Sequence, residues 1–148
     1  MGNAGSGSEE VQLCLSFLIR QAWFSMRSSV EEALVECRLS VPQYATLLVL
    51  EEQPGVSLSD LARVLVSTRQ SVTEMVAGME RDDLVERRRH PTNGRTHQVF
   101  LAEGGRKRLA EARPAVRARE GLMEEGLTDS QRTAARAWLA HVAAAGEA

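Results

Sequence analysis

Long apolar runs, aromatic residues and cysteine are all scarce in this chain of 148 residues. No apolar run approaches the roughly 20 residues that a membrane-spanning helix needs, and no signal-peptide hydrophobic segment follows the first residues. We therefore expect a cytoplasmic protein that has no membrane partner. Aromatic residues make up 4% of the chain and hydrophobic residues 43%, which is typical of a helix-rich globular domain with a real core.

The residue sets typical of enzymes and metal sites are also missing. The three histidines, His90, His97 and His141, are scattered, and no Cys/His pair has the spacing of metal ligands. No glycine-rich phosphate loop and no G-x-S-x-G elbow occurs in the sequence. We therefore expect no metal, no cofactor and no enzymatic activity.

Two short helices in tandem are predicted between residues 57 and 82. Ser57 can cap the first helix, whose apolar face is formed by Leu58, Leu61, Ala62 and Leu65. Ser67 and Gln70 stand three residues apart, as in a capping box for the second helix. The predicted buried stripe of this second helix contains Val72, Met75, Val76 and Met79.

An arginine-rich hairpin, the wing, is predicted directly after the second helix. Asp82 and Asp83 can end that helix, because aspartate tolerates the left-handed conformation better than most residues. Two strands, 84–89 and 95–101, flank a Pro-Thr-Asn-Gly turn. On the second strand one face is expected to hold Thr96, Gln98 and Phe100, and the other His97, Val99 and Leu101. Against a single acid, Glu86, the hairpin carries Arg87, Arg88, Arg89 and Arg95.

This order of elements is that of a winged helix-turn-helix, which predicts double-stranded DNA as a partner. An isolated basic run is more often a solvated surface. Beside a tandem helix pair, the arginines favour contact with phosphates or a narrow minor groove, while the first turns of the second helix reach the bases. A net charge of −2 does not exclude this, because DNA meets the local field of the wing. The residues predicted to contact DNA are Ser67, Thr68, Arg69, Gln70, Ser71, Thr73 and Glu74 on the helix, and Arg88, Arg89, Asn93, Arg95 and His97 on the wing.

The two ends of the chain are predicted to be helical. After a flexible tail at 1–8, a helix over 9–37 is apolar on more than one side, which indicates burial on more than one side. A helical region over 103–145 contains Pro114, which should kink or split it, and a capping box that begins at Thr128. These helices exceed what a DNA-binding module needs, so they predict a dimer interface. The alternative is that they thicken the core of a monomer.

The predicted fold class is therefore mainly α with a small β-hairpin wing, in which a winged helix-turn-helix core is joined to long N- and C-terminal dimerisation helices. We expect a single domain over 9–148. Its DNA-binding lobe is expected at about 40–101, with dimerisation helices at about 9–37 and 103–145.

Four segments carry a family resemblance: Leu58-Ser-Asp-Leu-Ala, Ser71-Val-Thr, Leu84-Val-Glu-Arg-Arg and Pro91-Thr-Asn-Gly-Arg95. Taken together they resemble the MarR family of multiple-antibiotic-resistance regulators. The resemblance implies a homodimeric bacterial transcription regulator, usually a repressor, that binds a pseudo-palindromic operator. It also implies that the operator is released when a small molecule or an oxidant acts on the protein.

Four positions depart from the pattern of that family. Asn93 and His90 stand where acidic residues are usual, so we expect the ion pairs that often brace the wing to be absent. Ala102 replaces the usual capping threonine before the next helix. Glu74 stands where a basic or neutral residue is common, so the operator sequence of relatives does not transfer to this chain.

The resemblance implies a small-molecule site where the first long helix, the helix around Tyr44 and the helix after the wing meet. The candidate ligand-binding residues are Trp23, Arg27 and Tyr44. An arginine beside two aromatic side chains suits an anionic aromatic effector, such as a phenolic acid. The alternative is that Trp23 and Tyr44 fill the core and that Arg27 is solvated.

Cys14 supports a second hypothesis, because its place near the start of the first helix resembles the sensing cysteine of the organic-hydroperoxide branch of the family. That branch has a tyrosine where this chain has Val41, and a buried cysteine on an apolar helix is usually inert. The alternative function is a thiol-based peroxide sensor, or a thiol peroxidase, that acts through Cys14. A disulfide to Cys37 within one straight helix is excluded, because the residues between them, at about 1.5 Å each, exceed disulfide reach.

Overall fold

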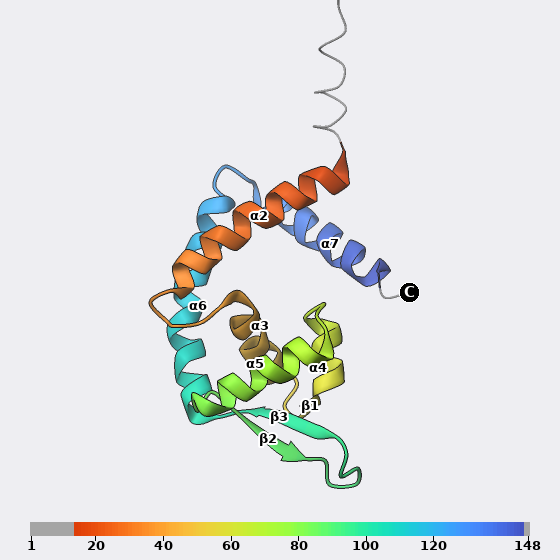
Figure 1. The fold of residues 1–148 in the computed structure, drawn as a ribbon. Coiled ribbons are helices and arrows are strands. Elements are labelled where there is room, and N and C mark those ends of the chain that lie inside the picture. The colour runs from red at the N-terminus through yellow and green to blue at the C-terminus, as the bar shows by residue number, and fades with distance from the viewer. Residues whose placement is uncertain (1–13, 147–148) are drawn as a thin grey trace, which may run out of the picture.

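The computed structural model describes residues 14–146 and is mostly helical, as predicted (Figure 1). Its helices are α2 (Leu15–Leu34), α3 (Val41–Glu52), α4 (Leu58–Val64), α5 (Arg69–Arg81), α6 (Glu103–Met123) and α7 (Asp129–Ala145). Its strands are β1 (Val56–Ser57), β2 (Val85–Arg89) and β3 (His97–Leu101). The predicted tail at 1–8 and the first part of the predicted N-terminal helix, 9–13, lie outside the described residues.

Helices α3, α4 and α5 and the three strands form a compact unit at one end of the molecule, the reading lobe (residues 41–101; Figure 1). The strands make an antiparallel sheet in the order β1-β3-β2, with Val56 opposite Val99 and Val85 opposite Leu101. The fully buried apolar side chains of the lobe are Leu47, Leu50, Leu61, Val72, Val76, Met79, Leu84, Val85 and Val99. The predicted stripes of both short helices thus meet in one core, and the winged helix-turn-helix fold is confirmed.

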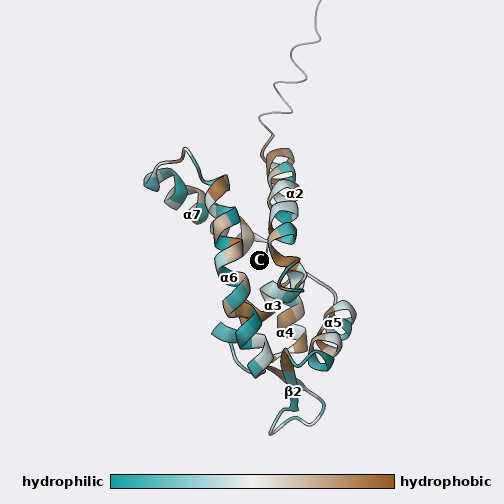
Figure 2. Ribbon diagram, turned by 90° about the vertical axis from the view of Figure 1, so that its left-hand side faces the viewer, coloured by the Kyte–Doolittle hydropathy of each residue, from teal (hydrophilic) through white to brown (hydrophobic). Residues whose placement is uncertain are grey.

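The remaining helices, α2, α6 and α7, are the end helices, and they extend from the reading lobe (Figure 1). Arg119 of α6 pairs with Glu32 of α2 at 3.4 Å, and Val30 and Leu34 of α2 are buried against the core. Helix α7 has no buried residue and leaves the far end of α6 (Figure 2). Large apolar side chains are exposed along these helices and the loop between α6 and α7: Leu15, Phe17, Leu18, Trp23, Phe24, Met26, Leu122, Met123, Leu127, Trp138, Leu139 and Val142.

Helix α2 ends earlier than predicted. It stops at Leu34 rather than at Cys37, because the chain turns through Arg38, whose φ is 53°. The amide of Leu39 donates to the carbonyl of Leu34 at 3.3 Å, and that of Arg38 donates to Val35 at 3.1 Å. These two bonds form the Schellman pattern that closes helices at a left-handed residue. The buried side chain of Leu39 then fixes the direction in which the chain enters α3.

Pro114 was predicted to kink or split the helix that contains it, and the split does not occur. Helix α6 runs from Glu103 to Met123 as one element, with Pro114 inside it. A proline removes one backbone hydrogen bond. Leu109, Ala112 and Val116 are buried on either side of it, and tertiary packing of such a face is the main source of helix stability in proteins.

Helix α6 begins in direct contact with the end of α5. Its N-cap, Ala102, provides no side-chain hydrogen bond, as expected from the loss of the usual threonine. The amide of Ala102 instead donates to the carbonyl of Leu84 at 3.0 Å. Gly105 is buried here, and a Cβ at this position would overlap the carbonyl oxygen of Leu84. Asp83 has φ 57° in the turn below, as predicted for an aspartate that ends α5.

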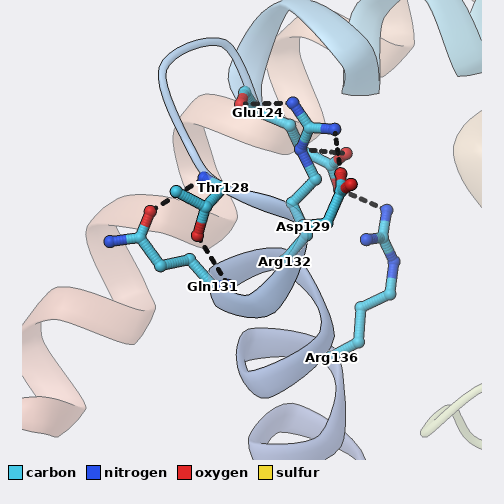
Figure 3. A network of polar contacts seen from close by, with 6 residues as sticks. All are labelled: Glu124, Thr128, Asp129, Gln131, Arg132 and Arg136. Atoms are coloured by element: carbon cyan, nitrogen blue, oxygen red, sulfur yellow. Dashed lines mark hydrogen bonds and ion pairs between the residues drawn. The ribbon is translucent and has the colours of Figure 1, made fainter.

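A polar corner joins α6 to α7 (Figure 3). The predicted capping box is confirmed, because Thr128 accepts from the amide of Gln131 at 3.2 Å and Gln131 accepts from the amide of Thr128 at 2.9 Å. Glu124 at the end of α6 pairs with both Arg132 and Arg136 of α7. The corner therefore sets the direction in which α7 leaves α6.

Candidate nucleic-acid interface and ligand cavity

The turn between α4 and α5 is closed by backbone hydrogen bonds and contains a strained residue. The amide of Ser67 donates to the carbonyl of Ala62 at 2.9 Å, and that of Val66 donates to Arg63 at 3.1 Å. This is again a Schellman pattern, in which the left-handed position is usually glycine. Here it is Val66, with φ 51° and a side chain that is 93% exposed. A β-branched residue is a clear outlier in this conformation.

This closure shifts the start of the second helix, so the predicted capping box at Ser67 and Gln70 is wrong by one position. The amide of Ser67 already completes the end of α4. Thr68 is the N-cap of α5 instead, and its Oγ1 accepts from the amide of Ser71 at 3.1 Å. The same hydroxyl donates to Oγ of Ser71 at 2.9 Å. Both hydroxyls therefore stabilise the first turn of the helix.

The first two turns of α5 present an exposed polar face. Nε2 of Gln70 donates to Oε1 of Glu74 at 3.3 Å, and Oγ1 of Thr73 donates to the carbonyl of Arg69 at 2.7 Å. Arg69 is exposed and makes no ion pair with any acid that the structure describes. Arg69 is thus the cation that this face offers to a ligand, while Glu74 is held beside Gln70.

The two faces of the wing strand β2 differ in what they contact. Arg87 lies opposite Val99 and extends toward α5, where it meets Glu80. Its amide donates to Oε2 of Glu80 at 2.9 Å, and its Nε and Nη2 donate to Oε1 at 3.3 and 3.1 Å. The backbone hydrogen bond from Arg87 lowers the pKa of Glu80, and the side-chain hydrogen bonds add to this. The wing is therefore braced by a different ion pair from those that the family places at positions 90 and 93: here the brace joins Glu80 of α5 to Arg87 of β2.

Sequence reasoning missed this brace because it considered each element by itself. The signal was present: the last turn of a helix and the middle of the following strand, joined by a three-residue turn, lie side by side. An acid and an arginine at those positions, seven residues apart, are a candidate ion pair.

Arg88 lies on the opposite face of β2 and is also occupied. Its Nη2 donates to Oε2 of Glu86 at 2.8 Å, and its guanidinium carbon lies 4.4 Å from the centre of the Phe100 ring. A cation above an aromatic face is attracted by the negative face of the ring. Arg88 is thus held along the strand, although its side chain is 59% exposed.

Arg89 and Arg95 remain without an acidic partner among residues 14–146, and both are exposed near the wing tip. The tip is closed by the amide of His90, which donates to the carbonyl of Thr96 at 2.8 Å. Oδ1 of Asn93 accepts from the amide of Arg95 at 3.3 Å, so Asn93 shapes the loop. His97 lies opposite Arg89 on β3 and is half-buried. The wing therefore carries two partnered and two free arginines.

A cavity of about 530 Å³ lies between α2 and the helix-turn-helix. Trp23 and Arg27 of α2 line it, together with Val66 and Ser71 of the helix-turn-helix. Val41, Pro42 and Met75 add apolar surface. Arg27 also pairs with Glu31, at 2.7 Å between Nε and Oε1. The cavity is mostly apolar, with one cation at its wall, and it touches the turn that begins α5.

Tyr44, the third predicted ligand-binding residue, does not line this cavity. It is only 8% exposed and belongs to the core. Burial raises the pKa of its phenol, while the charge of nearby Arg113 opposes the shift. Tyr44 thus packs toward α6, which corresponds to the alternative of core filler.

Cys14 is the N-cap residue of α2 and is exposed, rather than buried within an apolar helix. Its Sγ lies 3.2 Å from Oγ of Ser16, and this hydrogen bond is the main reason why the pKa of the thiol is lowered. Cys14 and Cys37 are both free thiols. Within residues 14–146 no cluster of three or more His, Cys, Asp or Glu side chains forms a metal site, and none of these helices is long and apolar enough to span a bilayer.

The fold and motifs agree with comparisons to known proteins. The MarR family model matches residues 39–97. The transcriptional repressor CouR, solved with a 23-mer DNA duplex, aligns with 97% of this chain and 99% of its own, at a TM-score of 0.84 and 27% identity. Residues 39–97, which include both short helices and most of the wing, therefore match the MarR family, and the fold as a whole resembles that of CouR.

Two other transcriptional regulators match over shorter stretches. HosA of Escherichia coli, a transcriptional regulator, is 38% identical over 76 residues, which are 51% of this chain and 56% of HosA. The chain thus matches a little over half the length of HosA. The transcriptional repressor IacR of Pseudomonas putida is 27% identical over 103 residues, 70% of this chain and 62% of IacR. CouR of Rhodococcus jostii, solved with p-coumaroyl-CoA, aligns at a TM-score of 0.82 and 25% identity over 90% and 94% of the two chains.

Proposed function

We propose that this protein is a homodimeric MarR-family transcription repressor that binds a pseudo-palindromic operator and releases it when a small anionic aromatic molecule binds. The observation that supports DNA binding is that some of its arginines are paired with acids while others are free. Arg69, Arg89 and Arg95 have no acidic partner in the described chain, and they lie on α5 and on the wing beside it. A helix that reads bases and a ribbon that neutralises phosphates are the two halves of winged-helix recognition.

The dimer is supported by the end helices. Trp23 and Phe24 on α2 are 51% and 55% exposed, and Leu139 on α7 is 50% exposed. Contiguous apolar patches on this scale mark interaction sites. A second copy of the same face would cover them with two-fold symmetry, and would place the two α5 helices about one DNA turn, roughly 34 Å, apart.

DNA contact is tested by substituting single arginines and measuring the affinity for DNA by fluorescence anisotropy at several salt concentrations. The operator is first selected from genomic DNA of the source. Arg95→Ala is expected to weaken binding to all duplexes alike and to reduce the salt slope, because a phosphate contact carries little base information. Arg69→Ala is expected to change base preference at matching positions of both half-sites as well. Arg117→Ala, on the exposed side of α6, is the control that removes the same charge.

Unchanged affinity of Arg95→Ala at every salt concentration would contradict the role of the wing. Identical selected sites for Arg69→Ala and wild type would contradict the role of α5 as the reader.

The effector site is the cavity at Trp23 and Arg27. Its apolar wall suits an aromatic ring, and the Arg27 guanidinium suits a carboxylate that competes with Glu31. The relative CouR has been solved with p-coumaroyl-CoA, which contains an aromatic acyl group and supports this class of ligand. A ligand here contacts Val66 and Ser71, so it favours one position of α5 relative to α2 and thereby changes the separation of the two α5 helices.

Such a ligand releases DNA only to the extent that it binds the free and DNA-bound states unequally. Coupling of about 1 to 3 kcal/mol would weaken operator binding by roughly 5- to 150-fold, and DNA would weaken ligand binding by the same factor. The variant Trp138→Phe leaves Trp23 as the single tryptophan, so its fluorescence reports binding of phenolic acids and of p-coumaroyl-CoA. Equal ligand affinity with and without operator would rule out the mechanism. Arg27→Gln is expected to weaken the binding of the phenolic acids most.

A second candidate function is peroxide sensing through Cys14. The specific observation is the exposed thiol whose pKa is lowered by Ser16. A sensor would consume one equivalent of an organic hydroperoxide and lose DNA affinity, a thiol peroxidase would turn over repeatedly, and Cys14→Ser would abolish either response. Full DNA affinity after oxidation excludes the sensor.

A further inference from the structure

We propose that Glu80 sets the DNA selectivity of the protein by holding Arg87 away from DNA and by fixing the wing against α5. Glu80 is then a positioning residue, and Arg87 is a clamp rather than a phosphate contact. The inference rests on the proposed function, because it requires that α5 and the wing bind DNA.

The contacts between Glu80 and Arg87 occupy both oxygens of the carboxylate. Oε2 accepts from the backbone amide of Arg87, and Oε1 accepts from Nε and Nη2 of its side chain. A side-chain ion pair alone could break and re-form as the wing moves. The backbone bond ties the position of β2 itself to the last turn of α5, so the brace holds the strand as well as the guanidinium.

The position of the pair explains why it acts on both DNA-contacting elements. Glu80 belongs to the last turn of α5, whose first turn carries Arg69. Arg87 lies in the middle of β2, two residues before Arg89, which is free. The brace therefore fixes the spacing between the helix that reads bases and the arginines at the wing tip.

The pair also removes one cation from the surface that DNA meets. The side chain of Arg87 is 29% exposed and its guanidinium is shared with a carboxylate, whereas Arg89 and Arg95 are exposed. Every mobile arginine added to a DNA-binding surface strengthens binding to all sequences, because phosphate contacts carry no base information. Holding Arg87 against Glu80 thus limits nonspecific binding and preserves the spacing that a specific site requires.

The test is Glu80→Gln, measured against a random-sequence duplex and against a duplex selected from genomic DNA. Arg87 is released by this change, so random-duplex binding is expected to strengthen and its salt slope to steepen by roughly 0.9 for each protomer. An added slope of this size corresponds to a further loss of affinity of about 3.5-fold per protomer between 50 and 200 mM salt. The selected duplex is expected to gain less or to lose affinity, so the ratio of specific to nonspecific binding falls.

Asp82→Asn is the matched control, because it removes one carboxylate at the end of α5, away from the predicted DNA-contacting residues, without releasing Arg87. Arg87→Gln alone is expected to leave the salt slope of the random duplex unchanged, whereas Arg95→Gln reduces it. The double variant Glu80→Gln/Arg87→Gln is expected to return that slope to the wild-type value. A purely structural role of Glu80 would lower affinity for both duplexes without steepening either slope.

Three results overturn the inference: a reduced salt slope in Arg87→Gln equal to that in Arg95→Gln, an unchanged slope in Glu80→Gln, or the same steepening in Asp82→Asn. Arg87→Lys keeps the charge but cannot form the paired bonds, so it provides a second route to the released state and is expected to behave like Glu80→Gln. Failure of the proposed function has a different signature, because wild-type protein would then bind neither duplex with any salt dependence.

Discussion

The reading lobe and the end helices bury their apolar residues to very different extents. Leu47, Leu61 and Met79 in the lobe are completely buried, whereas Phe24 and Leu139 on the end helices are at least half exposed. The lobe therefore satisfies its hydrophobic residues within one chain. The end helices carry equally apolar residues that a single chain leaves uncovered, which is what the proposed dimer interface requires.

The largest expected effect separates these two roles with one substitution in each region. Leu61→Ala is expected to lower the free energy of unfolding by about 3 kcal/mol at every protein concentration, because it leaves a cavity in the lobe core. Leu139→Ala removes the same atoms from an exposed site. Its effect is expected to act through the dimer and so to depend on protein concentration. Urea unfolding at two concentrations measures both, and a concentration-independent loss in Leu139→Ala would contradict the comparison.

The second effect concerns the junction of the two regions. Gly105→Ala places a Cβ against the carbonyl of Leu84 and is expected to cost about 2 kcal/mol, because the helix and the turn beneath it must separate. Gly121→Ala is the control in the same helix, with open space around the new Cβ. It is expected to stabilise by about 0.5–1 kcal/mol, since alanine favours helix over glycine. Thermal unfolding that ranks the two variants the other way would exclude the close approach.

The third effect lies at the edge of the reading lobe. Val66→Gly removes the strain of a β-branched residue in the left-handed conformation, but glycine loses more conformational entropy on folding. The net result is expected to be a rise of about 0.5–1 kcal/mol in the free energy of unfolding. Val35 is also exposed but has φ −54°, so Val35→Gly is expected to destabilise. Chemical denaturation of both variants checks the sign, and stabilisation in both would show that backbone conformation is not the cause.

The structure also indicates which features could be predicted from the sequence. The N-cap at Ser57, the capping box at Thr128 and the left-handed Asp83 depend on neighbours within a few residues, so local patterns were sufficient. The choice of Thr68 over Ser67 as the cap of α5 was not local. Both offer a hydroxyl, and the choice is made by the amide of Ser67, which bonds back to α4.

The candidate site was predictable to the extent that its residues share one element. The exposed face of α5 and the arginines of the wing followed from periodicity and position, and their contacts with DNA stay predictions. The roles of Arg87 and Tyr44 did not follow, because each depends on a partner from another element, Glu80 in one case and α6 in the other. Composition cannot tell a free arginine from a paired one.

The smallest expected effect is a pH dependence of the brace. The pKa of Glu80 is lowered in the folded state, so its contribution to stability is present above the ordinary glutamate pKa and is lost as pH falls through the lowered value. The difference in free energy of unfolding between wild type and Glu80→Gln is therefore expected to shrink as the pH is lowered from 6 to below about 4. Denaturation across this range measures the difference, and a constant value would mean that the carboxylate is not favoured by Arg87.

Because α6 is held closely at Gly105, a rotation at this contact would displace the other end of the helix. The 21 residues of this helix extend roughly 31 Å from the lobe, at about 1.5 Å per residue. The contact at Gly105 lies at one end of the helix, and the exposed apolar residues around Met123 lie at the other. A rotation of about 5° at the glycine contact would therefore displace the far end by roughly 3 Å. In the proposed dimer, a small change of angle where α6 meets the lobe would thus become a larger displacement of the exposed apolar residues around Met123.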